Sequence, residues 1–220
     1  MTKEERLIKE KERALELKKF EMEYRSLGHD FIAGVDEVGR GPLAGPVVTA
    51  CVVLNPDYEG LGIDDSKKLS EKKRESLYDE ILDNAICYGF GLCDNNLIDE
   101  INILEATKQA MKQAVDSAGR MLQEKLGQNI NLLLVDAVTI PGVDTKQISL
   151  IKGDSNSISI AAASILAKVK RDRMMIELDD VYPGYGFASN KGYGTKAHYE
   201  GLKKLGPTPI HRKSFLGNLN

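Results

Sequence analysis

The sequence predicts an α/β domain built around a mixed β-sheet. Short apolar runs rich in β-branched residues alternate with longer stretches of helical periodicity, and this alternation is typical of a sheet covered by helices. The first three runs follow one another closely, which suits an antiparallel meander. The fourth comes after a long helical crossover, which suits parallel addition to the sheet.

The composition is that of one domain, with room for a small appendage. The chain has 220 residues, of which 42% are hydrophobic and 29% are charged, enough for an ordinary core under a well-solvated surface. The formal net charge is −3, so the chain has no overall excess of positive charge that would attract nucleic acid. Any surface that binds nucleic acid must be a local basic region. No apolar run approaches the ~18 residues of a membrane span.

The three cysteines, Cys51, Cys87 and Cys93, lie in apolar, strand-like runs and form no CxxC pair. Their odd number and spacing predict neither a disulfide framework nor a zinc site. Buried, reduced thiols are expected, as in a reducing compartment. Because the first residues also lack the apolar core of a secretion signal, we expect a cytoplasmic protein.

Residues 3–27 predict a helix with one apolar stripe. Leu17, Phe20, Tyr24 and Leu27 recur at helical spacing, and most other positions are Lys, Arg or Glu. We expect the stripe to dock on the main domain. A contact with a partner helix or with nucleic acid stays open as the alternative.

Five strands are expected in the remainder of the chain. The second, PVVTACVVL, is rich in β-branched residues, and the fourth, NLLLV, is a compact apolar run, as buried strands should be. The five ranges are 31–35, 46–54, 85–93, 131–135 and 147–151.

Helices are expected between and after these strands. One begins after Ser70, a good N-cap, with Leu77 and Ile81 on its inner face. Small side chains at Ala161–Ser164 keep the middle of another helix thin, so that it can pack closely on the sheet. The expected helical ranges are 94–126 with a break near 95–99, then 155–178 and 195–205, with a loop at 182–194 and a tail at 207–220.

Carboxylates occur where three of the expected strands end. Asp36 and Glu37 follow the first strand, Asp136 ends the fourth, and Asp154 follows the fifth. If these strands are neighbours, four acids meet at one edge and repel one another, and a divalent cation would remove the conflict. Ligands that are all oxygen favour Mg²⁺ or Mn²⁺ over zinc, and two such ions are the usual means of phosphodiester hydrolysis. From the acids alone, capping of turns or helix starts is an equally good interpretation.

Gly39, Arg40 and Gly41 come directly after the first acidic pair and favour a ligand site. Glycines on either side of an arginine let the backbone approach a ligand closely, and a guanidinium can hold a phosphate with its forked donors. Alone, this tripeptide would be an ordinary turn. Its position beside Asp36 and Glu37 makes it a candidate for substrate contact.

These motifs together resemble ribonuclease HII, the bacterial type 2 ribonuclease H. The resemblance runs in the family's order over roughly residues 31–217. The segments that carry it are IAGVDEVGRGPLAGPV at 32–47, DSKKL at 65–69, VD at 135–136, KGD at 152–154, SIAAASILAKV at 159–169, KGYGT at 191–195, and GPTP with HR and SF between 206 and 215.

The resemblance implies an RNase H-like fold, a five-stranded mixed sheet flanked by helices and followed by a C-terminal helical segment. It places the catalytic domain at residues 29–220 and leaves residues 1–28 as an N-terminal helical extension. It also implies that four acids bind two Mn²⁺ or Mg²⁺ ions during turnover. These acids are Asp36, Glu37, Asp136 and Asp154.

The same resemblance implies a substrate and a cutting position. Members of the family act on RNA–DNA hybrids and on single ribonucleotides in duplex DNA, cutting on the 5′ side to leave a 3′-hydroxyl and a 5′-phosphate. Gly39–Gly41 would recognise the ribonucleotide with its 2′-hydroxyl, which distinguishes RNA from DNA, and Tyr193 would stack on the sugar beside the scissile bond.

Other motif residues are candidates for substrate contact, with Ser66, Lys67 and Lys152 foremost. Basic side chains can bind phosphates, although each one taken alone is better explained as a solvated surface residue. The further basic candidates are Lys68, Lys168, Lys191 and Arg212. No role is predicted for His211.

Three alternatives remain, and we expect a monomer in each case. A type 3 ribonuclease H is disfavoured because its counterpart of Arg40 is typically lysine. A hybrid-binding protein without activity is disfavoured because all four acids are present. A metabolic enzyme acting on a small phosphate ester lacks a phosphate-binding loop of the GxxxxGK type.

Overall fold

The computed structural model describes residues 2–217, and five strands in this part of the chain form one sheet. The sheet order is β3-β2-β1-β4-β5. β1 pairs with β2 and β2 with β3 in antiparallel fashion, whereas β4 pairs in parallel with β1 and β5. The expected meander and the parallel addition of the fourth strand are therefore confirmed. The strands are β1 (Ile32–Val38), β2 (Val47–Leu54), β3 (Ala85–Cys93), β4 (Leu132–Asp136) and β5 (Gln147–Leu150).

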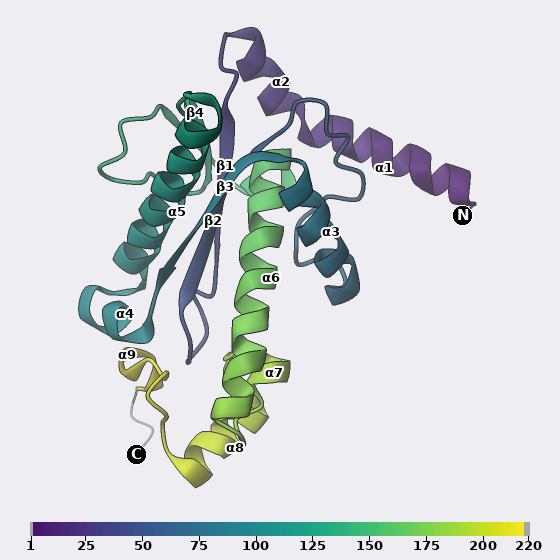
Figure 1. Ribbon diagram of the computed structural model, residues 1–220. Coiled ribbons are helices and arrows are strands. Elements are labelled where there is room, and N and C mark those ends of the chain that lie inside the picture. Colours follow the sequence, from purple (N-terminus) through teal and green to yellow (C-terminus); the bar gives the residue numbers. More distant parts are fainter. Residues whose placement is uncertain (1, 218–220) are drawn as a thin grey trace.

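Helices cover both faces of this sheet (Figure 1). α5 packs on one face and α6, with α3, on the other. The first group of helices is α1 (Lys3–Leu17), α2 (Lys19–Ser26), α3 (Glu71–Asp83), α4 (Asn95–Ile101) and α5 (Ile103–Leu126). The second group is η1 (Gly153–Ser155), α6 (Ile158–Val181), α7 (Phe187–Asn190), α8 (Lys196–Leu205) and α9 (Lys213–Leu216).

Alternation along the buried strands sets the two core layers. In β2, Ala50 and Val52 pack toward α6, while Cys51 and Val53 pack toward α5, because successive side chains of a strand point to opposite faces. All eight residues of β2 are buried, because this strand lies inside the sheet, between β3 and β1, with helices on both faces, and all but Thr49 are apolar. The three cysteines are free and buried, as expected.

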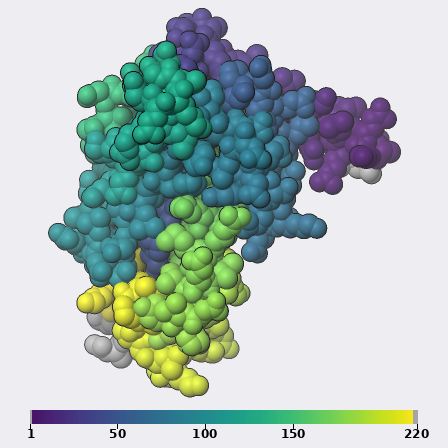
Figure 2. All heavy atoms as spheres, in the orientation of Figure 1, coloured from purple at the N-terminus to yellow at the C-terminus, as the bar shows by residue number. Residues whose placement is uncertain are grey.

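The N-terminal region forms two helices, with a break at Lys18 where one helix was expected. Leu17 is fully buried in the core beside α6, and Phe20 and Tyr24 pack on the neighbouring cluster. Docking of the apolar stripe is therefore confirmed for these three residues. It is wrong for Leu27, which is 65% exposed. Figure 2 shows α1 (purple) standing out from the body of the molecule.

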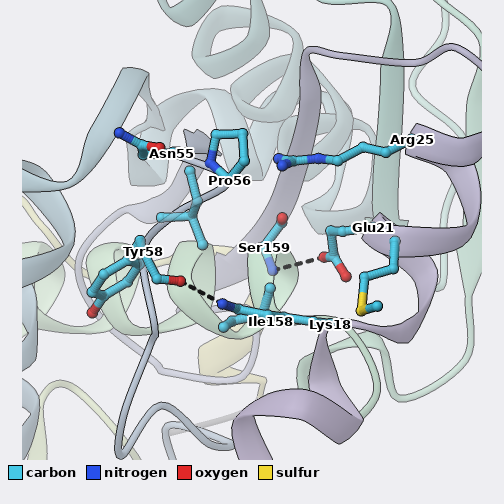
Figure 3. A pocket seen from close by; sticks show the side chains of 10 residues that line it. Lys18, Glu21, Arg25, Asn55, Pro56, Tyr58, Ile158 and Ser159 are labelled. Carbon is cyan, nitrogen blue, oxygen red and sulfur yellow. Dashed lines mark hydrogen bonds between the residues drawn. The ribbon is translucent and has the colours of Figure 1, made fainter.

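Polar contacts also fasten the N-terminal helices to the main domain. Figure 3 shows Glu21 of α2 facing the start of α6, where its Oε1 accepts hydrogen bonds from Ser157 Oγ at 2.6 Å and Ser159 N at 3.0 Å. Lys18 donates to the carbonyl of Tyr58. Further along α1, Arg13 Nη2 donates to Asp64 Oδ1 at 2.8 Å. A cavity of about 50 Å³ remains between α2 and the main domain.

Some element boundaries differ from the expectations. The first strand does not stop at residue 35 but continues through Asp36 and Glu37 to Val38, because β2 keeps pairing with it. The helical break falls at Asn102, whose φ of +69° ends α4, and not at residues 95–99. The last strand ends at Leu150, and the following long helix begins at Ile158.

The C-terminal part contains more helix than expected. The predicted loop at 182–194 includes α7, and the predicted tail includes α9. Residue 1 and residues 218–220, which the expected extension and tail include, lie outside the described residues. Over the part of the chain that is described, no helix is both long and apolar enough to cross a membrane.

Candidate active site

The four predicted acids lie around the ends of β1, β4 and β5. β1 and β4 pair up to Val35 and Val135, so Asp36 and Asp136 follow at the same level of adjacent strands. By the two-residue period of a strand, both point to the face covered by α6. The third acid position, Asp154, lies in η1 directly after β5 and before α6. The neighbouring order of these strands therefore brings the acids together, as expected.

Backbone hydrogen bonds hold two of these acids in place. Asp36 Oδ1 accepts from the N–H of Glu37 at 2.7 Å. Asp136 Oδ1 accepts from the N–H of Gly153 at 2.7 Å, which ties the end of β4 to the turn that carries Asp154. These bonds fix the orientation of the two carboxylates, and Asp36 also accepts a hydrogen bond from the side chain of Ser164.

Burial and mutual repulsion raise the pKa values of three acids. For Asp36 the largest cause is burial, followed by the charges of Glu37 and Asp136. Burial also raises the pKa of Glu37, although Arg40 Nη1, 3.4 Å from Glu37 Oε1, acts in the opposite direction. The pKa of Asp154 rises for the same reason. These shifts are what crowded carboxylates produce when they are desolvated together.

The acidic set fits a hard divalent cation in its donor chemistry. All its donor atoms are oxygens, and Glu37 Oε2 is buried and has no hydrogen-bond partner among the described residues. An unpaired buried carboxylate oxygen is costly unless it has a ligand. Within residues 2–217, no three acidic, histidine or cysteine side chains close on a single position as a finished coordination shell would.

Predicted substrate residues surround the acids at different depths. Ser66 is buried and its Oγ lies 2.9 Å from Ser164 Oγ of α6. Lys67 is exposed, with Nζ 3.8 Å from Asp154 Oδ2. Lys152 is exposed and has a left-handed backbone, with φ of +55°, just before η1. This arrangement places two solvated cations beside the acids.

Gly39–Gly41 and Tyr193 lie against each other although they are far apart in sequence. A Cβ added to Gly41 would lie 3.5 Å from Tyr193 Cε1. The two segments are also joined by a backbone hydrogen bond from Leu43 N to Gly192 O at 2.8 Å. Tyr193 is 44% exposed, so its ring is accessible beside the glycine turn.

Two residues near the site have roles that the sequence did not reveal. Ser164 was predicted only as a small residue for close packing, yet its hydroxyl lies beside Ser66 and next to Asp36. Arg212 was a candidate for phosphate contact, and that expectation is wrong because Arg212 is fully buried and donates to backbone carbonyls. A lone polar residue inside an alanine run was the available signal for Ser164.

A buried histidine pair supports the segment that carries Tyr193. Thr208 N donates to His211 Nδ1 at 2.9 Å, and a backbone N–H can only donate, so neutral His211 has its proton on Nε2. His211 Nε2 then donates this proton in a hydrogen bond to His198 Nε2, 2.9 Å away. His198 then has its proton on Nδ1 and donates it to the Tyr193 carbonyl at 2.9 Å. This tautomer assignment is the one that satisfies the whole chain of bonds.

Acid should weaken the fold through this pair. Burial, and then the neighbouring His198, lowers the pKa of His211 to about 4, from 6.5 in an unfolded chain. Between these pH values His211 binds a proton in the unfolded state but not in the folded state. The unfolding free energy is therefore at its full value above the unfolded pKa and decreases as the pH falls. Between about pH 7.5 and about pH 5, we therefore expect wild-type to lose about 2 kcal/mol more unfolding free energy than His211→Asn, in which the other titrating groups are the same. Urea denaturation at a series of pH values measures the unfolding free energy of each protein. The same dependence of that free energy on pH in both proteins would contradict the prediction.

Comparison with known proteins agrees with this geometry. A sequence model described as Ribonuclease HII matches residues 33–217. The chain belongs to the ribonuclease HII family. A ribonuclease HII from Lachnoclostridium phytofermentans is 56% identical over 215 residues, covering 98% of this chain and 81% of that protein. One from Enterococcus faecalis is 56% identical over 211 residues, covering 95% and 79%.

Solved structures show the same fold. The crystal structure of ribonuclease H2 from Pyrococcus horikoshii superposes with a TM-score of 0.64 at 30% identity, covering 83% of this chain and 92% of that one. The five-stranded sheet with its flanking helices is therefore RNase H-like, as expected. As a ribonuclease HII, the chain is a ribonuclease H, a metal-dependent endonuclease that acts on RNA–DNA substrates.

Proposed function

We propose that this ribonuclease HII cuts on the 5′ side of a single ribonucleotide in duplex DNA, and also cuts the RNA strand of hybrids, leaving 3′-hydroxyl and 5′-phosphate ends. One observation carries the proposal. The glycine turn at Gly39–Gly41 and the exposed ring of Tyr193 lie against each other, next to the acids at the end of β1. A site with these parts can test one sugar for a 2′-hydroxyl while the acids face the adjacent phosphate.

Asp36, Glu37, Asp136 and Asp154 would hold two Mn²⁺ or Mg²⁺ ions. When bound, such ions activate the attacking water and stabilise the leaving oxygen. The support from this chain is the all-oxygen donor set, the unpartnered Glu37 Oε2 and the raised pKa values of three of the acids. Asp136 links the set, because its charge raises the pKa values of Asp36, Glu37 and Asp154.

The other residues bind and orient substrate in this proposal. The backbone of Gly39, Arg40 and Gly41 would recognise the ribonucleotide, and Tyr193 would stack on the sugar beside the scissile bond. Lys67 and Lys152, which are both exposed, would contact phosphates. Ser66, buried against Ser164, would contact substrate from the turn before α3.

The organisation of the chain is part of the same proposal. Residues 29–220 would be the catalytic domain and residues 1–28 an N-terminal extension, in line with a family match that begins at residue 33. We expect the enzyme to act as a monomer in the cytoplasm. The free thiols of Cys51, Cys87 and Cys93 support a reducing compartment.

The test is cleavage of an end-labelled DNA duplex carrying one ribonucleotide, with Mg²⁺, with Mn²⁺ and with a chelator. We expect a single cut 5′ of the ribonucleotide with either ion and none with the chelator, because without a cation the acids cannot support the reaction. An all-DNA duplex of the same sequence is the control and should stay intact.

Two other outcomes would change the assignment. Robust cleavage of a long hybrid without the cut at a single ribonucleotide would retain the metal site and move the specificity toward type 3 enzymes. Folded protein that cuts neither substrate would contradict the proposed activity and leave hybrid binding as the function to pursue.

A further inference from the structure

Arg212 is a fully buried arginine whose guanidinium contacts the backbone behind the glycine turn. Its Nη2 donates to the carbonyls of Gly39 at 2.6 Å and Gly45 at 2.8 Å. Nη1 donates to the carbonyl of Arg40 at 2.9 Å, and Nε to that of Gly45 at 3.0 Å. Within residues 2–217, all the hydrogen bonds that this guanidinium donates therefore go to main-chain oxygens.

Burying a guanidinium in this way costs solvation free energy, so its contacts need an explanation. A buried charge needs compensation from hydrogen bonds, and here three carbonyls and the ring of Phe215, 5.1 Å from the guanidinium, provide it. Burial, and then the charge of Arg171, lowers the pKa of Arg212 to about 9. The group stays protonated at neutral pH, so all its donors remain in use.

The contacts of Arg212 fix the direction of two peptide units. The described peptides are all trans, and a trans peptide directs its C=O and N–H to opposite sides. When the carbonyls of Gly39 and Arg40 point inward to Arg212, the N–H groups of Arg40 and Gly41 point outward. In the described part of the chain, neither of these N–H groups donates to a protein acceptor, and both residues are exposed.

A second buried arginine connects this turn to the segment before Tyr193. Arg171 donates to the carbonyls of Pro46 at 2.8 Å, Lys191 at 2.8 Å and Ala44 at 3.2 Å. It packs so closely under Gly39, whose φ is +93°, that an added Cβ would lie 2.2 Å from Arg171 Nε. The turn is therefore held from behind by two rigid, planar donors, and Gly41 lies beside the ring of Tyr193.

We propose that Arg212 is a positioning residue for ribonucleotide recognition: it orients the peptides of the glycine turn so that the N–H groups of Arg40 and Gly41 receive the 2′-hydroxyl oxygen. The inference rests on the proposed function of that turn. Lysine keeps the charge but cannot hold three carbonyls in one plane. Arg212→Lys should therefore loosen recognition of the ribose while the acids stay in place.

The experiment compares the affinities of the full chain for two duplexes that differ by a single 2′-hydroxyl. Fluorescence anisotropy, with chelator present to prevent cleavage, gives the two dissociation constants and their ratio. We expect wild-type to prefer the ribonucleotide duplex and Arg212→Lys to lower that preference by up to about 30-fold, the effect of two hydrogen bonds. Leu202→Ala is the control, since it weakens the C-terminal core cluster against which Phe215, the ring beside Arg212, packs, and Leu202 lies in α8, outside the turn; it should keep the wild-type ratio.

The outcomes separate the two proposals. A wild-type protein without preference would overturn recognition by the turn, and the role of Arg212 with it. A wild-type preference that Arg212→Lys retains would overturn the role of Arg212 alone. A second measurement uses wild-type protein alone and so does not depend on whether the variant folds. Exchange of the amide hydrogens of Arg40 and Gly41 should slow when the ribonucleotide duplex is bound and not when the DNA duplex is bound. Equal protection by both duplexes would overturn the inference.

Discussion

Asp136→Asn is expected to remove cleavage of a ribonucleotide-containing duplex while leaving its binding nearly unchanged. Residues that only orient a metal ligand cost about 10–100-fold in activity when they are changed, so the loss of a ligand itself should exceed about 100-fold. The amide is neutral and a weaker ligand than a carboxylate, although it has nearly the same shape. It can also keep the hydrogen bond that Asp136 Oδ1 accepts from Gly153 N at 2.7 Å, so the turn carrying Asp154 should stay in place.

Single-turnover cleavage rates and duplex affinity, measured side by side, check this prediction. Asp116→Asn on α5 is the matched control, because it makes the same change in an exposed surface ion pair with Lys112 and should leave the rate unaffected. Circular dichroism must show that the Asp136→Asn protein is folded. A folded variant with more than about a tenth of wild-type activity would contradict a direct role for Asp136.

Gly34→Ala is expected to cost at least about 3 kcal/mol of unfolding free energy, at the upper end of what overpacking a core costs. A Cβ at Gly34 would lie 2.0 Å from Ser159 C, 2.2 Å from Ser159 O and 2.4 Å from Ile160 N. These are backbone atoms of α6, which cannot rotate aside as a side chain would. The helix would have to move off β1, and with it Ser164 would move away from Asp36.

Urea denaturation measures this cost, and cleavage by the same samples shows whether the site is disturbed. Gly119→Ala is the matched control: this glycine lies within α5, and an added Cβ there meets nothing within 4 Å. It should stabilise the protein by about 0.5–1 kcal/mol, since alanine is the better helix former. Equal effects of the two substitutions would show that β1 and α6 do not require the close approach.

Local sequence patterns predicted the main elements and most of the site. The β-branched run of β2, the N-cap Ser70 and the small residues at 161–164 each act through neighbours in the chain or through a simple packing face. The acids were predicted from their positions at strand ends, and the order of β1, β4 and β5 then brought them together. Their roles as metal ligands stay a prediction that the substitution of Asp136 tests.

Boundaries were harder to predict where a partner element decides them. β1 runs on through Asp36 and Glu37 because β2 supplies the pairing, and nothing in the residues themselves marks that end. The break between α4 and α5 depends on the left-handed backbone of Asn102, which caps α5 with its own side chain. Leu27 fits the helical stripe by spacing, but the main domain does not extend under it.

The sequence by itself determined the fold class, the family and the set of acids, because hydrophobic periodicity and motif order depend only on the order of residues along the chain. Only the tertiary structure decided what Arg171, Arg212, His198 and His211 do. Each would be counted from sequence as a surface cation or a lone histidine, since charge is usually solvated. Their donors instead meet carbonyls and ring nitrogens brought together from distant segments, and burial makes those contacts obligatory.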